Sequence, residues 1–556
     1  MPHHERIQLP RFFRTATLCK EIPIVCRETS IHRLKRDDEE VKGEDLKKKY
    51  SFSNEDILQI KALGLMPSDV HKQLKTYRRG PTFLKLLRPC IPGDGIRSFS
   101  AVERNRLIKR YDAEADKHSI LKFVPASGAA SRMFAAWFAA AQQGSFGNTG
   151  LDRSFFADLR KMPFYPMLEK DDAVRLMLKK RDVKAVLDRI LLSTGLQFGW
   201  LPKALIPFHA YRSGEVRTAL EEHLVEAASF NASDRGICRL HFTLSAEHTK
   251  AFKALLREII PRYEKRCHVR FKIGLSEQSQ ATNMIAADEK NLPFRDDDGH
   301  LVFRPGGHGA LLKNLQALNA DLIFVKNIDN IAPDALQKKI LPYKKMLGGL
   351  ALQLRLSVFT MLRRLEKNQI DSREIEAMSV FCQSELNRAM PKNFSSKTLA
   401  AKKKTIFELL NRPLRVCGMV HNEGEPGGGP FWVQEKDQSQ TLQIVESAHV
   451  DHNRASQAEI WSRASYFNPV DMVCCTKNYL GEKFDLADYV NQDAYLISPK
   501  TERGRNLKAQ EMPGLWNGGM AYWNTVFVAL PLMVFNPVKT VYDLLRPQHR
   551  GGTNFK

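Results

Sequence analysis

The chain has 556 residues, of which 43% are hydrophobic and 26% charged, so its composition is that of a globular protein and excludes a disordered or fibrous class. No apolar run reaches the roughly 20 residues of a membrane-spanning helix, and the longest, 526–535, is interrupted by Pro531. Nine cysteines are scattered without the spacing of a zinc site, and their odd number favours reduced thiols in a cytoplasmic protein.

The formal net charge of +23 leaves two classes of partner open. A basic protein can contact nucleic acid or a membrane surface, but it can also be an enzyme for polyanionic small molecules. The basic residues are spread along the chain, 402–404 being the clearest run, and we find no recognition-helix, zinc-finger or RNP-type motif. We therefore expect no membrane partner, and an RNA-associated protein is the less favoured alternative to an enzyme. The sequence carries no signal for an oligomeric state.

The first half of the chain predicts a charged extension, then helices, then an α/β region. Residues 1–50 are polar and charged, as a mobile extension would be, and 51–115 have helical periodicity broken by Pro-Gly-Asp-Gly at 92–95. Over 116–345, helical segments, the first from about Ser131, alternate with apolar strands at 120–124, 238–244, 269–273 and 322–325. That alternation predicts an α/β fold with a mainly parallel central sheet.

The second half of the chain predicts a helical insertion followed by more strands. Residues 346–405 have a helical pattern and few strand signals. Strands are expected again at 414–420, 431–433 and 442–445, and a segment rich in aromatic residues and asparagine covers 516–545. We assign 406–556 to the C-terminal half of the core.

The stretch FVPASGAASRMF, residues 123–134, runs from a strand through small residues into a helix. Ala126, Ser127 and Gly128 allow backbone amides to approach a ligand closely, and a helix N-terminus attracts phosphate through its free N–H groups. Arg132 can reach the same anion. Tight packing of a helix on a strand also uses small residues, so both interpretations stay open.

Lys203 lies between Pro202 and an apolar run. It is either a rigidly presented functional lysine or a surface lysine at the start of a strand. The segment 217–224 that follows is amphipathic, and we expect Glu221 and Glu222 on its solvated face rather than as a catalytic pair.

A glycine-rich loop made of Gly306, Gly307, His308 and Gly309 precedes a predicted helix and strand. Glycine is kept where the chain turns tightly or approaches something closely, so this loop can place backbone groups against a planar base or a ribose. Asp329 follows the strand, at the position where open α/β sheets bind ligands, and is a candidate Mg²⁺ ligand. A turn residue or helix N-cap is the other interpretation of Asp329.

The C-terminal half holds further candidates for ligand binding. Glu446 ends a predicted strand and can accept hydrogen bonds from hydroxyl groups. His449 and Asp451 are spaced as a metal pair, but no third ligand follows nearby. Asn517 lies among aromatic residues, and Lys539 comes after an apolar strand.

The order of these motifs resembles that of the sugar-nucleotide pyrophosphorylases. In that family A-G-G-x-G-T-R-L cradles the nucleoside triphosphate, and 126–133, ASGAASRM, is similar position by position. Its Pro-Lys lysine resembles Lys203, its Val-Asp-Asn strand end resembles 328–330, and its F-x-P-L-K lysine resembles Lys539. The UDP-sugar branch adds a glutamine-containing turn and P-x-G-x-G, to which 276–280 and 305–309 are similar. The resemblance covers about 120–545 and looks closest to an uncharacterised bacterial family of unknown function.

The resemblance implies a glycosyltransferase-A-like nucleotidyltransferase core and a transfer of UMP from UTP to a sugar 1-phosphate with release of pyrophosphate. It implies that Arg132 neutralises the pyrophosphate, that Lys203 bridges the phosphates and that Asp329 binds Mg²⁺. The implied nucleotide-binding residues are Ala126, Ser127, Gly128, Gln278, Gly306, Gly307, His308 and Gly309, and those for the sugar and its phosphate are Glu446, Asn517 and Lys539. Ser127 and Ala130 replace two family glycines, so a degenerate nucleotide-binding protein without turnover is the alternative.

Overall fold

The computed structural model describes residues 52–550 apart from 129, 369 and 426, and these residues belong to one compact unit. The predicted extension over residues 1–50 lies outside the described residues. The internal boundaries at 115/116, 345/346 and 405/406 remain predictions.

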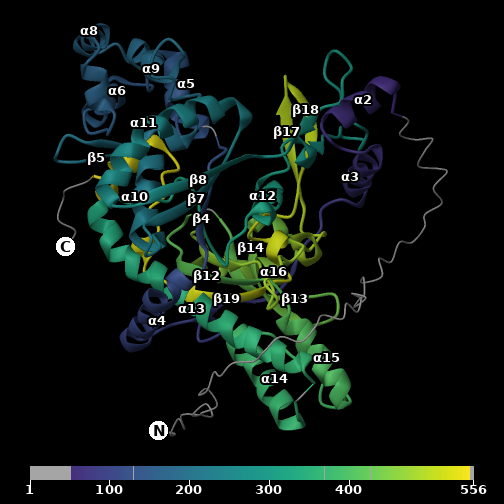
Figure 1. Cartoon of the computed structure of the whole chain (residues 1–556). Helices are drawn as coiled ribbons and strands as arrows, with labels where there is room; N and C mark the ends of the chain where they lie inside the picture. The colour runs from purple at the N-terminus through teal and green to yellow at the C-terminus, as the bar shows by residue number, and fades with distance from the viewer. Residues whose placement is uncertain (1–51, 129, 369, 426, 551–556) are drawn as a thin grey trace. The chain divides into compact units, whose positions relative to one another are not determined.

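A ten-stranded sheet lies at the centre, with the strand order β2-β3-β19-β12-β16-β11-β4-β7-β8 and β15 paired to β12 (Figure 1). The strands are β2 Ile91–Pro92, β3 Gly95–Arg97, β4 Ile120–Pro125, β7 Ile237–Leu244, β8 Arg270–Glu277, β11 Leu322–Lys326, β12 Leu414–His421, β15 Tyr466–Phe467, β16 Asp471–Cys475 and β19 Asn524–Ala529. All neighbouring strands pair in parallel except where β16 or β15 takes part. The prediction of an α/β fold with a mainly parallel sheet is confirmed.

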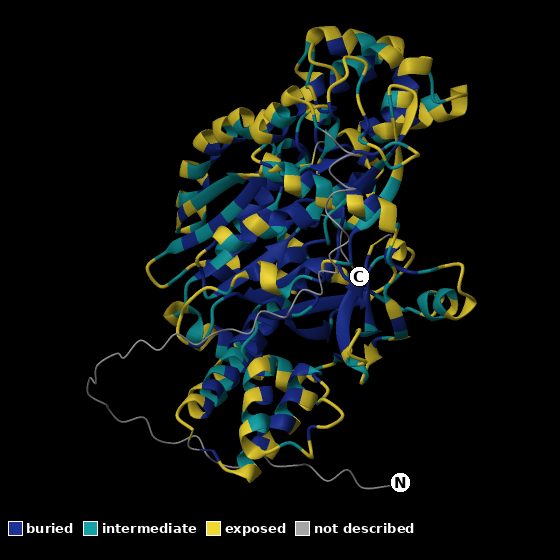
Figure 2. Ribbon diagram, turned by 90° about the vertical axis from the view of Figure 1, so that its right-hand side faces the viewer, coloured by how far each residue is buried: buried dark blue, intermediate teal, exposed yellow. Residues whose placement is uncertain are grey.

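Alternating side chains of the central strands enter different cores, which is why most of the residues in these strands are apolar. Leu322 and Phe324 of β11 pack on the face covered by α4 Ala101–Glu114 and α13 Asp334–Glu366. Ile323 and Val325 pack on the other face, with residues of α12 Leu312–Ala317. Figure 2 shows the middle of this sheet in the dark blue of buried residues, whereas the edge strands β2 and β8 are largely exposed or intermediate.

Smaller elements surround the sheet. The remaining strands are β1 Lys85–Pro89, β5 Pro207–Ala210, β6 Val216–Thr218, β9 Met284–Ile285, β10 Phe303–Arg304, β13 Gly429–Gln434, β14 Gln440–Val445, β17 Leu496–Glu502 and β18 Arg505–Glu511. The remaining helices are α2 Asn54–Ala62, α3 Pro67–Arg79, α5 Ala135–Gln143, α6 Thr149–Leu159, α7 Tyr165–Glu169, α8 Asp172–Lys180, α9 Val183–Leu191, α10 Ala219–Asn231, α11 Thr249–Cys267, α14 Ser372–Leu386, α15 Leu399–Leu410 and α16 Ala455–Ser462. Within the described residues, no helix combines the length and apolar character needed to cross a bilayer.

The predicted strands are confirmed to within a few residues, but four other predictions were wrong. The helix expected from Ser131 begins at Ala135, after a 3₁₀ turn over Ala130–Arg132. The region 51–115 contains β1, β2 and β3 as well as helices. Helix α13 begins at Asp334 and packs on β12 and β16, so most of it is part of the core rather than an insertion. Helices α14 and α15 pack on each other and also contact β19 and α13, respectively.

The fourth error concerns Glu221 and Glu222, which were expected on a solvated face. Both are buried in α10. Glu221 forms a capping box with Thr218, whose hydroxyl accepts from the Glu221 backbone N–H. Amphipathic spacing did not reveal that this helix is buried on most of its circumference.

Candidate functional site

The carboxyl ends of parallel strands bring several of the predicted residues to one edge of the sheet. Strand β4 ends at Pro125 before the small-residue loop, β8 ends before Gln278, and β11 ends shortly before Asp329. Ligands of open α/β sheets bind at this edge. The sheet order places β11 directly beside β4, so Asp329 and the small-residue loop follow adjacent strands.

Lys203, Asp329 and Lys539 come together from three distant segments. Lys203 Nζ donates to Asp329 Oδ2 at 3.0 Å and to the carbonyl oxygen of Val538 at 2.8 Å. Lys539 Nζ donates to the same Asp329 Oδ2 at 3.1 Å. Asp329 is only 9% exposed, and its Oδ1 is buried without a hydrogen-bond partner among the described residues. One carboxylate oxygen therefore receives two ammonium groups, while the other receives none.

The charges of this group are unbalanced. Burial alone would raise the pKa of Asp329, but the Lys203 and Lys539 ammonium groups outweigh it, and the pKa is lowered. Burial lowers the pKa of Lys203; the Asp329 carboxylate opposes this, and the charges of Lys539 and Arg132 add to it. Arg132 is exposed. Two ammonium groups thus share one carboxylate, and the charge of Arg132 acts on Lys203 as well, so the excess positive charge suits a phosphate ligand.

The small-residue loop has a packed side and an exposed side. Ala126 and Ala130 are buried, and their N–H groups donate to the carbonyl oxygens of Thr243 and Leu201 at 3.0 and 2.9 Å. Gly128 is exposed, and a Cβ added there would meet open space. Both interpretations of the motif therefore hold for different residues: the alanines pack, and Gly128 borders open space. The helix N-terminus expected at this loop lies further along the chain, at Ala135.

The glycines of the 306–309 loop are explained by contact with the segment 511–514. A Cβ on Gly307 would lie 2.5 Å from Glu511 Oε2, and one on Gly309 would lie 2.2 Å from the carbonyl oxygen of Pro513. The close approach that these glycines permit is therefore made to protein. The nucleobase-binding role of the loop and of Gln278 stays a prediction.

His308 joins this loop to a second polar group at the edge of the sheet. Its Nδ1 accepts from the N–H of Leu515 at 3.1 Å, and its ring stacks on Trp516 with the centroids 4.3 Å apart. Its Nε2 lies 3.6 Å from Glu446 Oε1, which also accepts from Asn517 Nδ2 at 3.0 Å. Asn517 Oδ1 is buried without a partner among the described residues.

Glu446 is held in its charged form within this second group. Burial alone would raise its pKa, but the nearby His308 side chain, together with His449 and the Asn517 amide, outweighs burial and lowers it. Among the described residues, no hydrogen bond or ion pair joins this group to the one around Asp329.

The metal interpretation of His449 and Asp451 gains no third ligand. His449 Nε2 donates to the carbonyl oxygen of Ala494 at 3.2 Å, and Asp451 pairs with Arg454 at 3.2 Å. Within the described part of the chain, three side chains of metal-binding type lie close together only at Asp296, Asp298 and His300, on an exposed loop.

A cluster of buried charges next to Asp329 was missed from the sequence. We call Lys122, Lys326, Lys344, Glu226 and Asp471 the buried lysine cluster. The carboxylate of Glu226 forms ion pairs with Nζ of Lys122 at 2.5 Å, of Lys326 at 2.6 Å and of Lys344 at 3.5 Å. Lys344 Nζ also donates to both carboxylate oxygens of Asp471 at 3.0 Å. The available signal was a lysine inside the apolar strand 120–125, because a buried lysine requires a buried carboxylate.

Comparison with known proteins places the chain in a family. The model described as a domain of unknown function (DUF4301) matches residues 53–550, and the chain therefore belongs to this family. None of the curated proteins compared with the chain matches it.

Solved structures with a similar fold include three proteins from Leishmania major and Trypanosoma brucei. A mutant UDP-glucose pyrophosphorylase from Leishmania major is 13% identical, with a TM-score of 0.42 over 88% of this chain and 77% of that one. The UDP-glucose phosphorylase from Trypanosoma brucei is 12% identical, with a TM-score of 0.41 over 88% and 77%. The uridine diphosphate N-acetylglucosamine pyrophosphorylase from Trypanosoma brucei is 11% identical, with a TM-score of 0.43 over 83% and 72%. Likeness at this level assigns no activity to the chain.

Proposed function

We propose that the protein is a sugar-1-phosphate nucleotidyltransferase that transfers a nucleotidyl group, with UTP as the favoured donor, and releases pyrophosphate. The observation that carries the proposal is the convergence of Lys203 and Lys539 on Asp329, beside Arg132 and at the carboxyl ends of parallel strands. The motif order that resembles the sugar-nucleotide pyrophosphorylases supports the same reaction. The glycosyltransferase-A-like core is part of this proposal.

In this reaction an oxygen of the sugar phosphate attacks the α-phosphorus of the nucleotide in line. A new P–O bond forms as the bond to the β-phosphate breaks, and pyrophosphate leaves with the electron pair. The protein supplies position and charge rather than a covalent step. Lys203 and Lys539 hold the α-phosphate and the sugar phosphate, and Arg132 neutralises the departing pyrophosphate.

The residues present fit a magnesium ion to which the protein contributes only one carboxylate, that of Asp329. Mg²⁺ usually takes one or two carboxylates together with substrate phosphates and water. Asp329 offers the buried, unpartnered Oδ1, while its Oδ2 is held by the lysines. When bound, the ion would supply charge neutralisation and Lewis acidity at the phosphates. The lysines keep Asp329 ionised and oriented for this role.

The group around Glu446 would bind the sugar. Glu446 and Asn517 present a carboxylate and an amide to hydroxyl groups, and Trp516 stacked on His308 offers an apolar surface to a sugar ring. Gln278 and the glycine-rich loop would hold the uracil. A sugar bound at Glu446 and a phosphate bound at Lys539 would connect two groups of residues that have no direct bond.

A nucleotide-binding protein without turnover is the alternative. It is favoured by Ala130, which stands where the family has a glycine and whose N–H donates to the carbonyl oxygen of Leu201 rather than being free for phosphate. An RNA-associated protein is the other alternative, and it predicts a steep dependence of RNA binding on salt concentration.

Release of pyrophosphate from UTP, Mg²⁺ and a panel of sugar 1-phosphates tests the proposal. We expect release with at least one sugar phosphate, its loss in Lys203→Ala, and its retention in Lys404→Ala, a control whose side chain is exposed. Stabilisation by UTP without release from any sugar phosphate would favour the binding protein. The proposed function would be overturned if UTP, Mg²⁺ and the sugar 1-phosphates produced no pyrophosphate and UTP did not stabilise the protein.

A further inference from the structure

Two buried histidines, His209 and His549, form a pair that links β5 to the C-terminal segment. Their side chains are 0% and 1% exposed. His209 Nε2 lies 2.9 Å from His549 Nδ1, and the rings stack with centroids 5.2 Å apart and planes 17° from parallel. On the other side of His209, Nδ1 lies 2.9 Å from Glu222 Oε1.

The hydrogen bond between the two rings needs one proton, which lies between His209 Nε2 and His549 Nδ1. A carboxylate only accepts, so His209 Nδ1 donates to Glu222. Between the two rings one nitrogen donates and the other accepts. Burial, together with the neighbouring His209 and Arg546 side chains, holds the pKa of His549 well below its ordinary value. His549 therefore stays neutral near pH 7, and the contact between the rings persists.

The pair is anchored to helices on the sheet. Glu222 lies in α10 and also accepts from the hydroxyl of Tyr211 at 2.6 Å and from Gln337 of α13 at 3.3 Å. Arg217 NH1 lies 3.4 Å from Glu222 and 2.7 Å from Asp334. His209 thus belongs to a rigid polar network, and His549 is attached to that network through His209.

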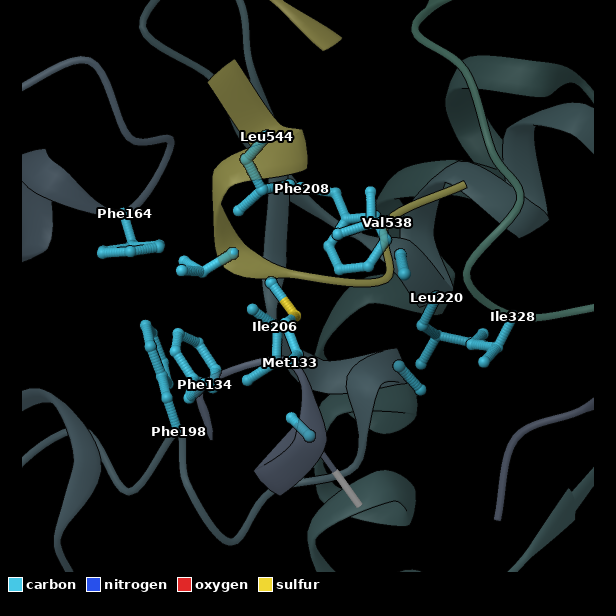
Figure 3. Packing of buried hydrophobic residues seen from close by; sticks show 14 of the residues in the cluster. Met133, Phe134, Phe164, Phe198, Ile206, Phe208, Leu220, Ile328, Val538 and Leu544 are labelled. Carbon is cyan, nitrogen blue, oxygen red and sulfur yellow. The ribbon is translucent and has the colours of Figure 1, made fainter. Parts of the chain in front are cut away.

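The two histidines follow the two lysines of the candidate site along the chain. Lys203 leads into β5, which contains His209, and Lys539 leads into the C-terminal segment that ends near His549. The β5 segment and the C-terminal segment contribute to the same apolar core, in which Phe208 packs near Val538 and Leu544 (Figure 3).

The lysines themselves need an external support. Two ammonium groups on one carboxylate oxygen repel each other, and Lys539 is bound through Nζ only to Asp329 among the described residues. At its backbone, the Lys539 N–H donates to Asp543 at 2.8 Å. The histidine pair fastens the far end of the segment that carries Lys539 to the segment that carries Lys203.

We propose that His209 and His549 are positioning residues that set Lys539 relative to Lys203. The geometry stands without any ligand; its importance for phosphate binding rests on the proposed function. The N–H groups of Val538 and Val541 also donate to the carbonyl oxygens of Asp329 and Met133, each at 3.0 Å, so these nearer bonds and the histidine pair hold the segment together. Loosening the pair would leave the nearer bonds alone to hold Lys539, and the bond from Lys203 to the carbonyl oxygen of Val538 would weaken.

Amine labelling of the ligand-free, full-length protein tests the pair directly. Acetylation rates at Lys203 and Lys539 would be followed by peptide mass spectrometry in three variants. His549→Leu keeps an apolar side chain but loses the hydrogen bond. His549→Asn keeps an amide close to the position of Nδ1. Tyr111→Phe removes a buried hydrogen bond elsewhere, from the Tyr111 hydroxyl to the carbonyl oxygen of Phe230 at 2.8 Å.

We expect His549→Leu to raise the labelling rate at both lysines roughly fivefold, which corresponds to about 1 kcal/mol. His549→Asn should stay near the wild-type rates, and Tyr111→Phe should lower the melting temperature without changing either rate. Unchanged rates in His549→Leu, or an equal rise in Tyr111→Phe, would overturn the inference. If His549→Leu does not fold, His549→Gln replaces it, because its amide lies at the position of Nε2 and misses His209.

The outcome is separable from that of the proposed function. Labelling needs no nucleotide, so the positioning role can be upheld even when no sugar phosphate yields pyrophosphate. Conversely, pyrophosphate release by the wild type combined with unchanged labelling in His549→Leu would overturn the positioning role alone. When both hold, His549→Leu should lower kcat more than it changes KM for UTP, since the lysines act on the transition state.

Discussion

Strand β11 and the turn after it contribute to two groups of lysines and carboxylates with opposite properties. In the buried lysine cluster, both oxygens of Glu226 and both oxygens of Asp471 receive lysines, and all five side chains are buried. In the group around Asp329, one carboxylate oxygen has two lysines and the other has no partner among the described residues. The first is a closed structural unit, and the second has unused capacity for a ligand.

The difference follows from position on the sheet. Lys326 is the last residue of β11 and lies under α10 and α13, where water is excluded and every charge must be paired. Asp329 lies in the turn beyond the strand, where exposed Arg132 and partly exposed Lys539 reach solvent. The same residue types thus stabilise the fold in one place and are available for binding in the other.

The largest expected effect is on the buried lysine cluster. Glu226→Gln leaves three buried lysines with only Asp471 as a carboxylate partner, so we expect the free energy of unfolding to fall by about 3–5 kcal/mol. Chemical denaturation measures it. Glu459→Gln, which breaks an exposed pair with Arg463, is the control and should change stability by less than about 1 kcal/mol. Equal losses in the two variants would show that the cluster is not a closed unit.

Variants of the open group should affect turnover more than folding. Lys203→Ala and Arg132→Ala should each lower the rate of pyrophosphate release roughly 100-fold, the scale of losing one preorganised charge at the transition state. Arg132→Ala should melt at the wild-type temperature because Arg132 is exposed. A near-normal rate in both variants would remove these residues from the reaction.

A pH titration sharpens the contrast from the side of the closed cluster. Burial lowers the pKa of Lys122 from 10.5 to about 8. Between these values the unfolded chain binds more protons at Lys122 than the folded chain does, so this residue makes the free energy of unfolding rise with pH. We expect wild type to gain stability relative to Lys122→Met between about pH 8 and about pH 10.

Denaturation of the two proteins at both pH values measures the gain. The pKa of Lys344 is raised, because Asp471 and Glu226 outweigh the opposing effect of burial, so its titration falls above this window. Lys404→Met removes an exposed lysine and should show no such relative change. A difference between wild type and Lys122→Met that is constant with pH would contradict the lowered pKa of Lys122.

The sequence predicted the sheet well because apolar runs mark strands buried on both faces, as in 322–325 and 414–420. The order of the motifs also predicted that Lys203, Asp329 and Lys539 share one site, and the structure brings these three side chains together, while their roles stay a prediction. The glycines at 306–309 were a signal of close approach, but the sequence does not show whether that approach is to a ligand or to residues 511–514.

What the sequence could not show are contacts between distant buried polar residues. The spacing predicted that Glu222 lies on a solvated face, whereas in the structure it is a hydrogen-bond partner of His209 because β5 lies beside α10. His549 carries no local pattern at all. Long-range pairing of this kind depends on the tertiary arrangement, which periodicity and spacing do not encode.

The central claim is that Asp329 and its two lysines bind a magnesium–nucleotide complex, and melting curves of Asp329→Asn test it most directly. Asp329→Asn leaves the largely buried Lys203 ammonium group without its carboxylate partner, so the melting temperature of the ligand-free protein should fall. The quantity to compare between the two proteins is therefore the increase in stability that the ligand produces. Wild type should gain stability with Mg²⁺ and UTP, about 2.7 kcal/mol at a hundred times the dissociation constant. We predict that the Mg²⁺-dependent part of this gain is lost in Asp329→Asn, and an undiminished Mg²⁺-dependent gain in that variant would contradict the account.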